Sequence, residues 1–219
     1  MMRLLKDNGL TIVLLVLFAM SIGGQLVAGW KVASEDALRH GQQAKALTEY
    51  TQSPDFLSSV FENWESEFLQ MSAYVVLTAF LFQRGSAESR DPDAPPRDAD
   101  LKRKAMNKGA PAILRLGSIA RALYAQSLGL ALGLLFVLSF VVHWTQSARV
   151  AAQEALEHGE AAPTVFGYLG DPQLWFESFQ NWQSEFLSTA VLVVLSIFLR
   201  QRESPESKAV AARHSKTGA

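Results

Sequence analysis

Apolar residues gather in four blocks along the chain, and most charged residues lie between those blocks. The blocks cover residues 10–30, 68–82, 123–144 and 186–199. The first and third have the roughly 20 residues that a helix needs to cross the hydrocarbon core of a bilayer. The second and fourth reach that length when their helices begin near Trp64 and Trp182. None of the blocks alternates polar and apolar residues, as the strands of a membrane β-barrel do.

The pattern therefore predicts an all-α integral membrane protein with four transmembrane helices. We expect spans at about 10–30, 64–83, 123–144 and 182–200. The first block also has the features of a secretory signal, because Arg3 and Lys6 precede it and LVAG (26–29) near its end contains small residues. An internal repeat favours an uncleaved helix, since the repeat aligns this block with one in the middle of the chain.

The repeat is clearest in two nine-residue stretches, FENWESEFL from Phe61 and FQNWQSEFL from Phe179, which lie 118 positions apart. The same offset aligns ALRHG (37–41) with ALEHG (155–159) and FLFQR (80–84) with FLRQR (198–202). Each repeat is then a helical hairpin with a loop of about 35 residues between its two spans. The predicted domains are a first hairpin at 1–84, a linker at 85–110, a second hairpin at 111–202 and a tail at 203–219.

Positive charge predicts the orientation. Sixteen of the 20 lysines and arginines lie in the N-terminal segment, the linker region and the tail, and four lie in the two hairpin loops. The positive-inside rule places both termini and the linker in the cytoplasm and both hairpin loops outside. Both hairpins then enter and leave on the same side, so the repeats are parallel, related by an axis along the membrane normal.

The segments between the spans differ in character. The linker 85–104 is rich in proline, aspartate and arginine and is expected to be flexible, and the tail is expected to be disordered. After Pro111, apolar residues from Ile113 to Leu123 share one helical face, and Arg115 and Arg121 lie off it. This segment is either a basic amphipathic helix on the inner leaflet or an extension of the third span.

The outer loops carry helix-end signals. Gly41 and Gly159 suit left-handed caps at helix C-termini. Ser53 and Asp171 are suitable N-caps, each followed by a proline that fits the first helical turn.

The second helix of each hairpin places an amide and a carboxylate four residues apart on one face, near the outer membrane boundary. These pairs and two aligned polar residues of the other spans form the candidate polar site: Asn63, Glu67, Asn181, Glu185, Gln25 and His143. Ionisable groups at membrane depth are costly and often mark function. Three interpretations stay open: a polar clasp between the hairpins, a binding site for a cation, head group or small solute, and a proton relay.

Two other sets of residues fit a membrane protein. Four indoles near the outer boundary are expected to anchor the helices at the interface, namely Trp30, Trp64, Trp144 and Trp182. Small residues that allow close packing of helices include Gly23, Gly24, Gly129 and Gly133.

Composition argues against several classes of function. The formal net charge of −1 shows no basic bias towards nucleic acid, and the absence of cysteine excludes disulfides and thiolate chemistry. The four histidines lack metal-binding spacing, and no catalytic or cofactor motif occurs. We therefore expect no metal, no cofactor and no enzymatic activity.

The segments DNGLTIVLLVLF, FENWESEFLQMSAYVVLTAFLFQRGSAESRDPD and NWQSEFLSTAVLVVLSIFLRQRESPESK resemble a bacterial family of small integral membrane proteins that is described only as a domain of unknown function. The resemblance covers nearly the whole chain, and its most specific motif is the repeated NWxSEFL. It implies a multi-pass protein of the bacterial inner membrane and supplies no catalytic residues.

The sequence thus predicts a non-enzymatic membrane protein that associates with itself, with a larger membrane complex or with lipids. The alternative is a small oligomeric transporter or channel that uses the Asn/Glu pairs. A channel needs further polar residues along the inner halves of its spans, and the second and fourth spans have few besides Thr78 and Ser196.

Overall fold

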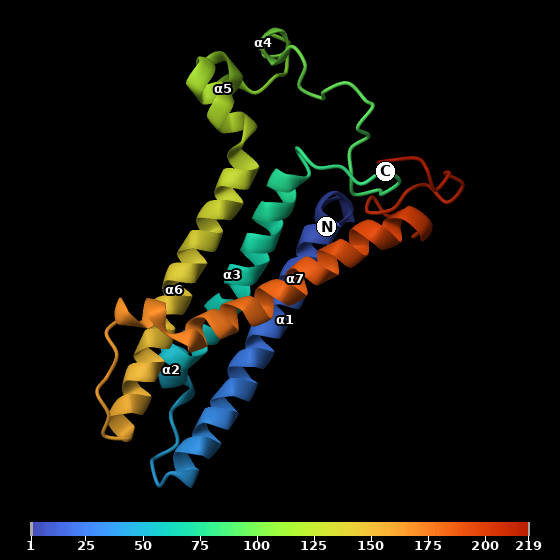
Figure 1. Cartoon of the computed structure of the whole chain (residues 1–219). Coiled ribbons are helices and arrows are strands. Elements are labelled where there is room, and N and C mark those ends of the chain that lie inside the picture. Colours follow the sequence, from blue (N-terminus) through green and yellow to red (C-terminus); the bar gives the residue numbers. More distant parts are fainter. Residues whose placement is uncertain (1, 219) are drawn as a thin grey trace. The chain divides into compact units, whose positions relative to one another are not determined.

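The computed structural model describes residues 2–218, and every regular element in that range is helical (Figure 1). The elements are α1 (Met2–Arg39), α2 (Leu47–Tyr50), α3 (Pro54–Leu77), α4 (Leu101–Lys104), the 3-10 helix η1 (Ala112–Arg115), α5 (Ser118–Ala125), α6 (Ser127–Glu157), the 3-10 helix η2 (Gly167–Gly170) and α7 (Pro172–Phe198). The prediction of an all-α protein is therefore confirmed for the described residues.

Two helices of the described range are long and apolar enough to cross a bilayer. They are Leu5–Arg39 within α1 and Ser127–Glu157, which is α6, with mean hydropathies of 2.3 and 2.0. None of the most apolar window of α1 is buried, and only 17% of that of α6 is. Side chains such as Leu10, which is 74% exposed, and Leu134, which is 60% exposed, are therefore available to lipid.

The C-terminal ends of α1 and α6 are closed by glycine, as the sequence predicts. Gly41 and Gly159 adopt φ angles of 74° and 71°. The residue after each glycine donates its amide hydrogen to a carbonyl five residues back, Gln42 to Ala37 at 2.8 Å and Glu160 to Ala155 at 2.7 Å. This pattern is the Schellman motif, which needs a left-handed residue at the helix end.

The N-terminal ends of α3 and α7 are also those that the sequence predicts. Ser53 Oγ accepts from the amide of Phe56 at 3.2 Å, and Asp171 Oδ1 accepts from the amide of Gln173 at 2.8 Å. Each helix begins at the proline that follows its cap. Both caps satisfy an amide that the first helical turn leaves without an intrahelical partner.

The structure divides into two compact units. One holds the described residues up to Val60 together with Val142–Tyr168, and the other holds Phe61–Val141 together with the chain from Leu169 onward. Helices α3 and α6 contribute to both units, so these units do not coincide with the two predicted hairpins.

In the first unit, hydrogen bonds and aromatic contacts tie the segment between α1 and α3 to the helices. Trp30 Nε1 donates to the carbonyl of Lys45 at 2.7 Å. The buried Tyr50 lies against Gly29, where a larger residue would collide with the phenol, and its ring is 5.5 Å from that of Phe56. Ser58 and Ser147 link α3 to α6 through their hydroxyl groups at 2.6 Å.

In the second unit, α3 and α6 approach closely at glycine. A methyl group at Gly129 would lie 3.1 Å from the Val76 side chain, and one at Gly133 would lie 3.4 Å from Ser72 Oγ. Gly23 and Gly24 of α1, in contrast, have no described atom within 4 Å of that position. Of the four glycines predicted to pack against other helices, Gly129 and Gly133 therefore lie against α3.

The tail makes defined contacts with the linker. Lys208 is 1% exposed, and its ammonium lies within hydrogen-bond distance of five carbonyl oxygens, including those of His214 at 2.9 Å and Lys216 at 3.0 Å. Burial lowers the pKa of this lysine. One of the five carbonyls belongs to Gly85, so the lysine holds the tail against the start of the linker.

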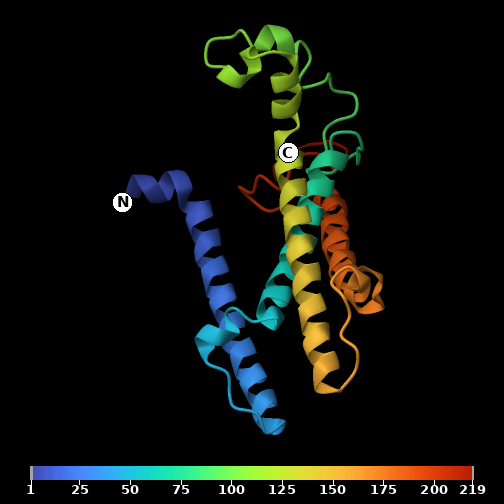
Figure 2. The same cartoon turned by 90° about the vertical axis from the view of Figure 1, so that its left-hand side faces the viewer.

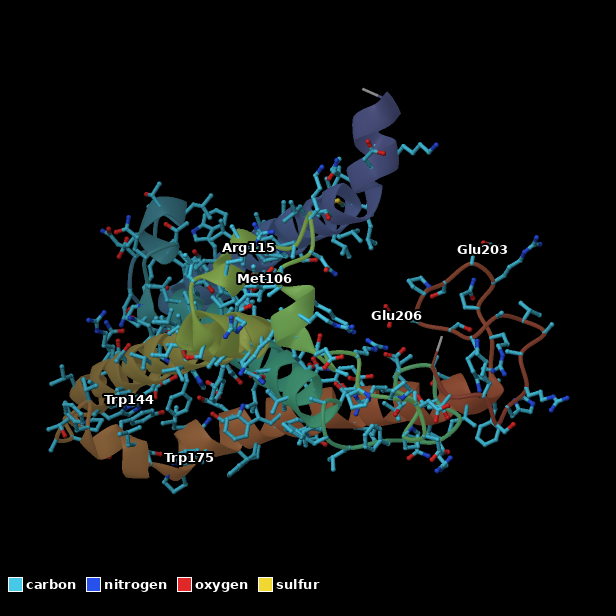
Figure 3. All side chains as sticks on the ribbon, turned by 90° about the horizontal axis from the view of Figure 1, so that it is seen from above. Met106, Arg115, Trp144, Trp175, Glu203 and Glu206 are labelled. Carbon is cyan, nitrogen blue, oxygen red and sulfur yellow. The ribbon has the colours of Figure 1, made fainter. Side chains whose placement is uncertain are left out.

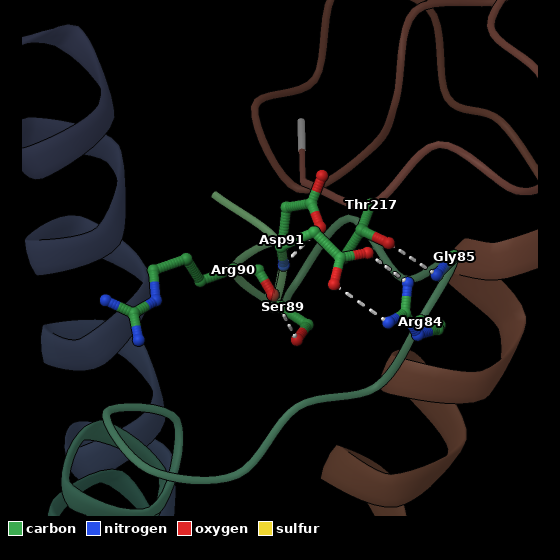
Figure 4. Close-up of polar contacts among 7 residues, drawn as sticks. Arg84, Gly85, Ser89, Arg90, Asp91 and Thr217 are labelled. Atoms are coloured by element: carbon green, nitrogen blue, oxygen red, sulfur yellow. Dashed lines mark hydrogen bonds and ion pairs between the residues drawn. The ribbon is translucent and has the colours of Figure 1, made fainter. Parts of the chain in front are cut away.

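Further contacts join the linker to the tail, as Figure 4 shows, and to α7. The amide of Gly85 donates to Thr217 Oγ1 at 2.9 Å, and Arg84 forms two hydrogen bonds with Asp93, at 2.7 and 3.2 Å. Ser86 Oγ lies 2.8 Å from Ser196 Oγ of α7. Turns in the tail are therefore held by the linker, an arrangement that no periodic pattern in the sequence encodes.

Candidate functional site

Polar side chains of α3 and α7 face one another within the second unit, and we call this set the α3–α7 polar seam. It consists of Glu62, Glu65 and Gln70 on α3 and of Asn181, Trp182 and Thr189 on α7. The α7 members lie in and after the second nine-residue stretch, and the α3 members lie in and after the first.

The first contact of the seam, counted along α3, joins Glu62 to Asn181. Asn181 Nδ2 donates to Glu62 Oε1 at 2.6 Å and also to the carbonyl of Glu177 at 3.3 Å. Hydrogen bonds to an ionised acceptor are shorter and stronger than neutral ones. The half-buried carboxylate of Glu62 on α3 thus holds the side-chain amide of Asn181 in place beside the Glu177 carbonyl of α7.

The central contact joins Glu65 to Trp182. Glu65 is fully buried, and its Oε1 accepts from Trp182 Nε1 at 2.9 Å. The indole is held from its sides by edge-on rings, with Phe179 at 5.4 Å and Phe136 at 6.2 Å between ring centroids. A buried carboxylate is tolerated only where donors compensate for lost water, so this contact constrains how α3 and α7 can pack.

The third contact joins Gln70 to Thr189. Gln70 Nε2 donates to Thr189 Oγ1, which in turn donates to the carbonyl of Glu185 at 3.0 Å. The three contacts are three and five residues apart on α3 and one and seven residues apart on α7, so they hold one side of each helix against the other.

The predicted Asn/Glu pairs contribute only one residue to this seam. Asn63 and Glu67 are exposed, and Glu185 is half-buried. The sequence reasoning missed Glu62 and Glu65, although it contained a usable signal. The offset of 118 aligns these two glutamates with Gln180 and Gln183, so they are positions at which the first stretch is acidic and the second is neutral.

The other candidate residues have separate roles. Gln25 donates to Ser59 Oγ at 3.2 Å within the first unit, rather than to a glutamate, and His143 is fully buried. Trp144 Nε1 donates to the carbonyl of Val165 at 2.8 Å, much as Trp30 does to Lys45, and the ring of Trp64 lies 5.0 Å from that of Phe61 in a tilted arrangement. Trp30 and Trp144 thus hold loop residues, and whether the indoles lie at a membrane interface stays a prediction.

Beyond Gln70 the seam opens into an apolar groove of about 400 Å³ between α3 and α7. Its walls include Ala73, Leu77, Phe186, Ala190, Val193 and Val194. At its far end Tyr74 Oη donates to Glu88 Oε2 at 2.9 Å. Burial raises the pKa of Glu88, and the nearby carboxylate of Glu206 acts in the same direction, while the hydrogen bond from Tyr74 opposes them.

The arrangement is suited to holding helices together. Each of the three contacts pairs a group on α3 with one on α7, and the groove beside them is lined mainly by hydrocarbon. The expectation that the chain carries no metal and no cofactor stays a prediction.

We expect replacement of Glu65 by alanine to destabilise the fold, because it leaves the half-buried indole N–H of Trp182 without this acceptor. The cost of such a group is about 1–3 kcal/mol. Thermal unfolding in detergent measures it, and the exposed Glu67→Ala is the matched control with an expected change within about 0.5 kcal/mol. Equal effects of the two substitutions would contradict the assignment of Glu65 to the seam.

The raised pKa of Glu88 predicts that the stability of the fold depends on pH. Its raised pKa means that the folded state favours the neutral carboxyl, so stability is full below the ordinary range of a glutamate and falls as pH rises through the raised pKa. Glu88→Gln stays neutral and keeps an acceptor for Tyr74. We expect this variant to melt at a higher temperature than the parent at pH 8 and at the same temperature at pH 4. The exposed Glu160→Gln should melt at the same temperature as the parent at both pH values. A Glu88→Gln variant that also melts with the parent at pH 8 would contradict the raised pKa of Glu88.

Comparisons with known proteins bear on the identity of the chain. No curated protein and no solved structure matches it. One family model, described as a domain of unknown function (DUF6766), matches residues 1–219. Since this match covers the whole chain and agrees with the resemblance found in the sequence, the chain belongs to the DUF6766 family.

Proposed function

We propose that the chain is a non-enzymatic, four-span protein of the bacterial inner membrane that serves as a scaffold or accessory subunit, either self-associated or within a larger membrane complex. The α3–α7 polar seam is the observation that carries this proposal. Its polar groups are used on one another, as a structural clasp requires, and its central carboxylate is fully buried.

We place the two further spans of the proposed four where other apolar side chains are exposed. Besides α1 and α6, the later half of α7 exposes Leu187 (62%) and Phe198 (58%), and the chain just after α3 exposes Phe80 (70%). Exposed apolar surface on this scale is unfavourable in water and is suited to lipid. In the proposed topology the hairpin loops are outside, and the termini and the linker are in the cytoplasm, as the positive charges favour.

The proposed parallel repeat accounts for the positions of the seam contacts. Their partners are 119, 117 and 119 residues apart, close to the offset of 118 between the repeated stretches. Two equivalent helices that face each other around an axis along the membrane normal would pair in this way. The clasp then joins the two hairpins of one chain.

A transporter or channel is supported less well. Its path would need polar groups in contact with water, whereas Glu65 has no exposed surface and the groove beyond the seam is mainly apolar. Asn63 and Glu67 are exposed, but the chain has few polar residues deeper in the same spans.

The proposed topology is tested by single cysteines, since the chain has none of its own. In intact cells, a maleimide that does not cross the inner membrane should label Thr48→Cys and Glu160→Cys in the hairpin loops. It should label Asp98→Cys in the linker only after lysis. Labelling of Asp98→Cys in intact cells, or protection of both loop sites, would exclude the four-span arrangement.

The scaffold role is tested by purifying the protein without crosslinking and measuring its mass and its co-purifying proteins. We expect either a homo-oligomer or a stable heteromeric complex, and no ion flux when the protein is reconstituted into liposomes. A protein that remains a lone monomer, or one that conducts ions and loses conductance in Glu67→Gln, would overturn the scaffold proposal, and the second result would favour a channel.

A further inference from the structure

We propose that residues 101–125, here called the basic amphipathic segment, bind the surface of an anionic phospholipid bilayer beside the start of α6. This inference rests on the membrane placement of α6 in the proposed function. It assigns a partner to a segment that the scaffold role leaves without one.

The charge of the segment is of one sign. It contains six cationic residues, Lys102, Arg103, Lys104, Lys108, Arg115 and Arg121, and no aspartate or glutamate. Clusters of four to eight lysines and arginines immediately before a membrane helix are attracted to anionic lipid. This segment precedes α6, one of the two described helices that could cross a bilayer.

The same segment exposes large apolar side chains. Leu116 is 78% exposed, Ile119 is 76%, Met106 is 71% and Leu123 is 58%. Ile119 and Leu123 are four residues apart on α5, so they share a face, and Arg121 lies on the opposite face. An amphipathic helix of this kind lies in the interfacial plane with its apolar face among the acyl chains.

The internal contacts of the segment keep these apolar residues outward. Arg115 donates through Nε to the carbonyl of Ala105 at 3.2 Å and through Nη2 to that of Asn107 at 3.1 Å. Arg121 donates to the carbonyl of Leu114 at 3.2 Å, and Leu114 is buried. Figure 3 shows Met106 and Arg115 on this segment, apart from Glu203 and Glu206 of the tail. The guanidinium groups thus fold the segment, while the lysines remain exposed.

The chain changes conformation between the segment and the membrane helix. Gln126, with φ of −110° and ψ of 5°, separates α5 from α6, so α5 is not an extension of the third span, which the sequence had left open. Figure 2 shows the segment gathered at the N-terminal end of α6. With that end at the head-group level, α5 can lie along the surface, which favours a bilayer over an acidic protein as the partner.

The test places the full-length protein in nanodiscs of phosphatidylcholine alone and of phosphatidylcholine with phosphatidylglycerol. An environment-sensitive fluorophore is attached to Leu116→Cys on the apolar side or to Ser118→Cys as the matched control on the polar side. We expect the Leu116 label to be blue-shifted and quenched by a lipid-borne quencher in the anionic discs, and less so in the neutral ones. The Ser118 label should remain in water in both.

The charge contribution is tested by replacing Lys102, Lys104 and Lys108 with glutamine. Arg103 is left in place because it pairs with Asp100 at 3.2 Å, and Arg115 and Arg121 are left because they fold the segment. Removing the three lysines should weaken the preference for anionic discs by up to about a hundredfold.

A label on Leu134→Cys within α6 separates the two possible failures. If Leu134 reports lipid and Leu116 reports water in both discs, the surface proposal is overturned and the span remains. If Leu134 also reports water, the membrane placement itself is wrong. Equal burial of Leu116 in both kinds of disc, or burial only when an acidic protein is added, would likewise overturn the proposal of an anionic bilayer surface.

Discussion

The hydrogen bond between the buried carboxylate of Glu65 and the indole of Trp182 is the interaction on which the second unit depends. A carboxylate removed from water is costly unless a donor compensates for the lost hydration, and Trp182 supplies such a donor at 2.9 Å. In lipid this requirement is stricter, because water is not available to replace a lost partner. The pairing therefore specifies one packing of α3 on α7.

The rest of the unit follows from this pairing. Phe136 of α6 contacts the same indole, and α6 reaches α3 at Gly129, so three helices meet around one polar contact. The groove beyond Gln70 is the space left where the polar contacts stop and small side chains such as Ala73 and Ala190 face each other. In the proposed scaffold role, a clasp of this kind would give a stable platform of helices whose apolar surface faces lipid or other membrane proteins.

Local signals in the sequence predicted local structure well. Helix content, the glycine caps at Gly41 and Gly159 and the caps at Ser53 and Asp171 each depend on a few neighbouring residues, so a reader of the sequence can identify them. The seam was harder to predict, because the two faces of an interfacial helix look equally polar in a sequence. Helical spacing grouped Asn63 with Glu67, whereas the packing turned Glu65 inward. The contacts of Lys208 in the tail could not be predicted for a related reason, since one lysine that lies near five carbonyl groups leaves no periodic pattern in the sequence.

A double-mutant cycle between Glu65 and Trp182 tests the central claim most directly. Glu65→Ala, Trp182→Phe and the double variant are unfolded in the same detergent, and Trp182→Phe keeps an aromatic ring while it removes the N–H donor. The account predicts a favourable coupling of about 0.5–3 kcal/mol, the range for residues that share a contact. Effects that add within about 0.5 kcal/mol, as they do for distant sites, would contradict it.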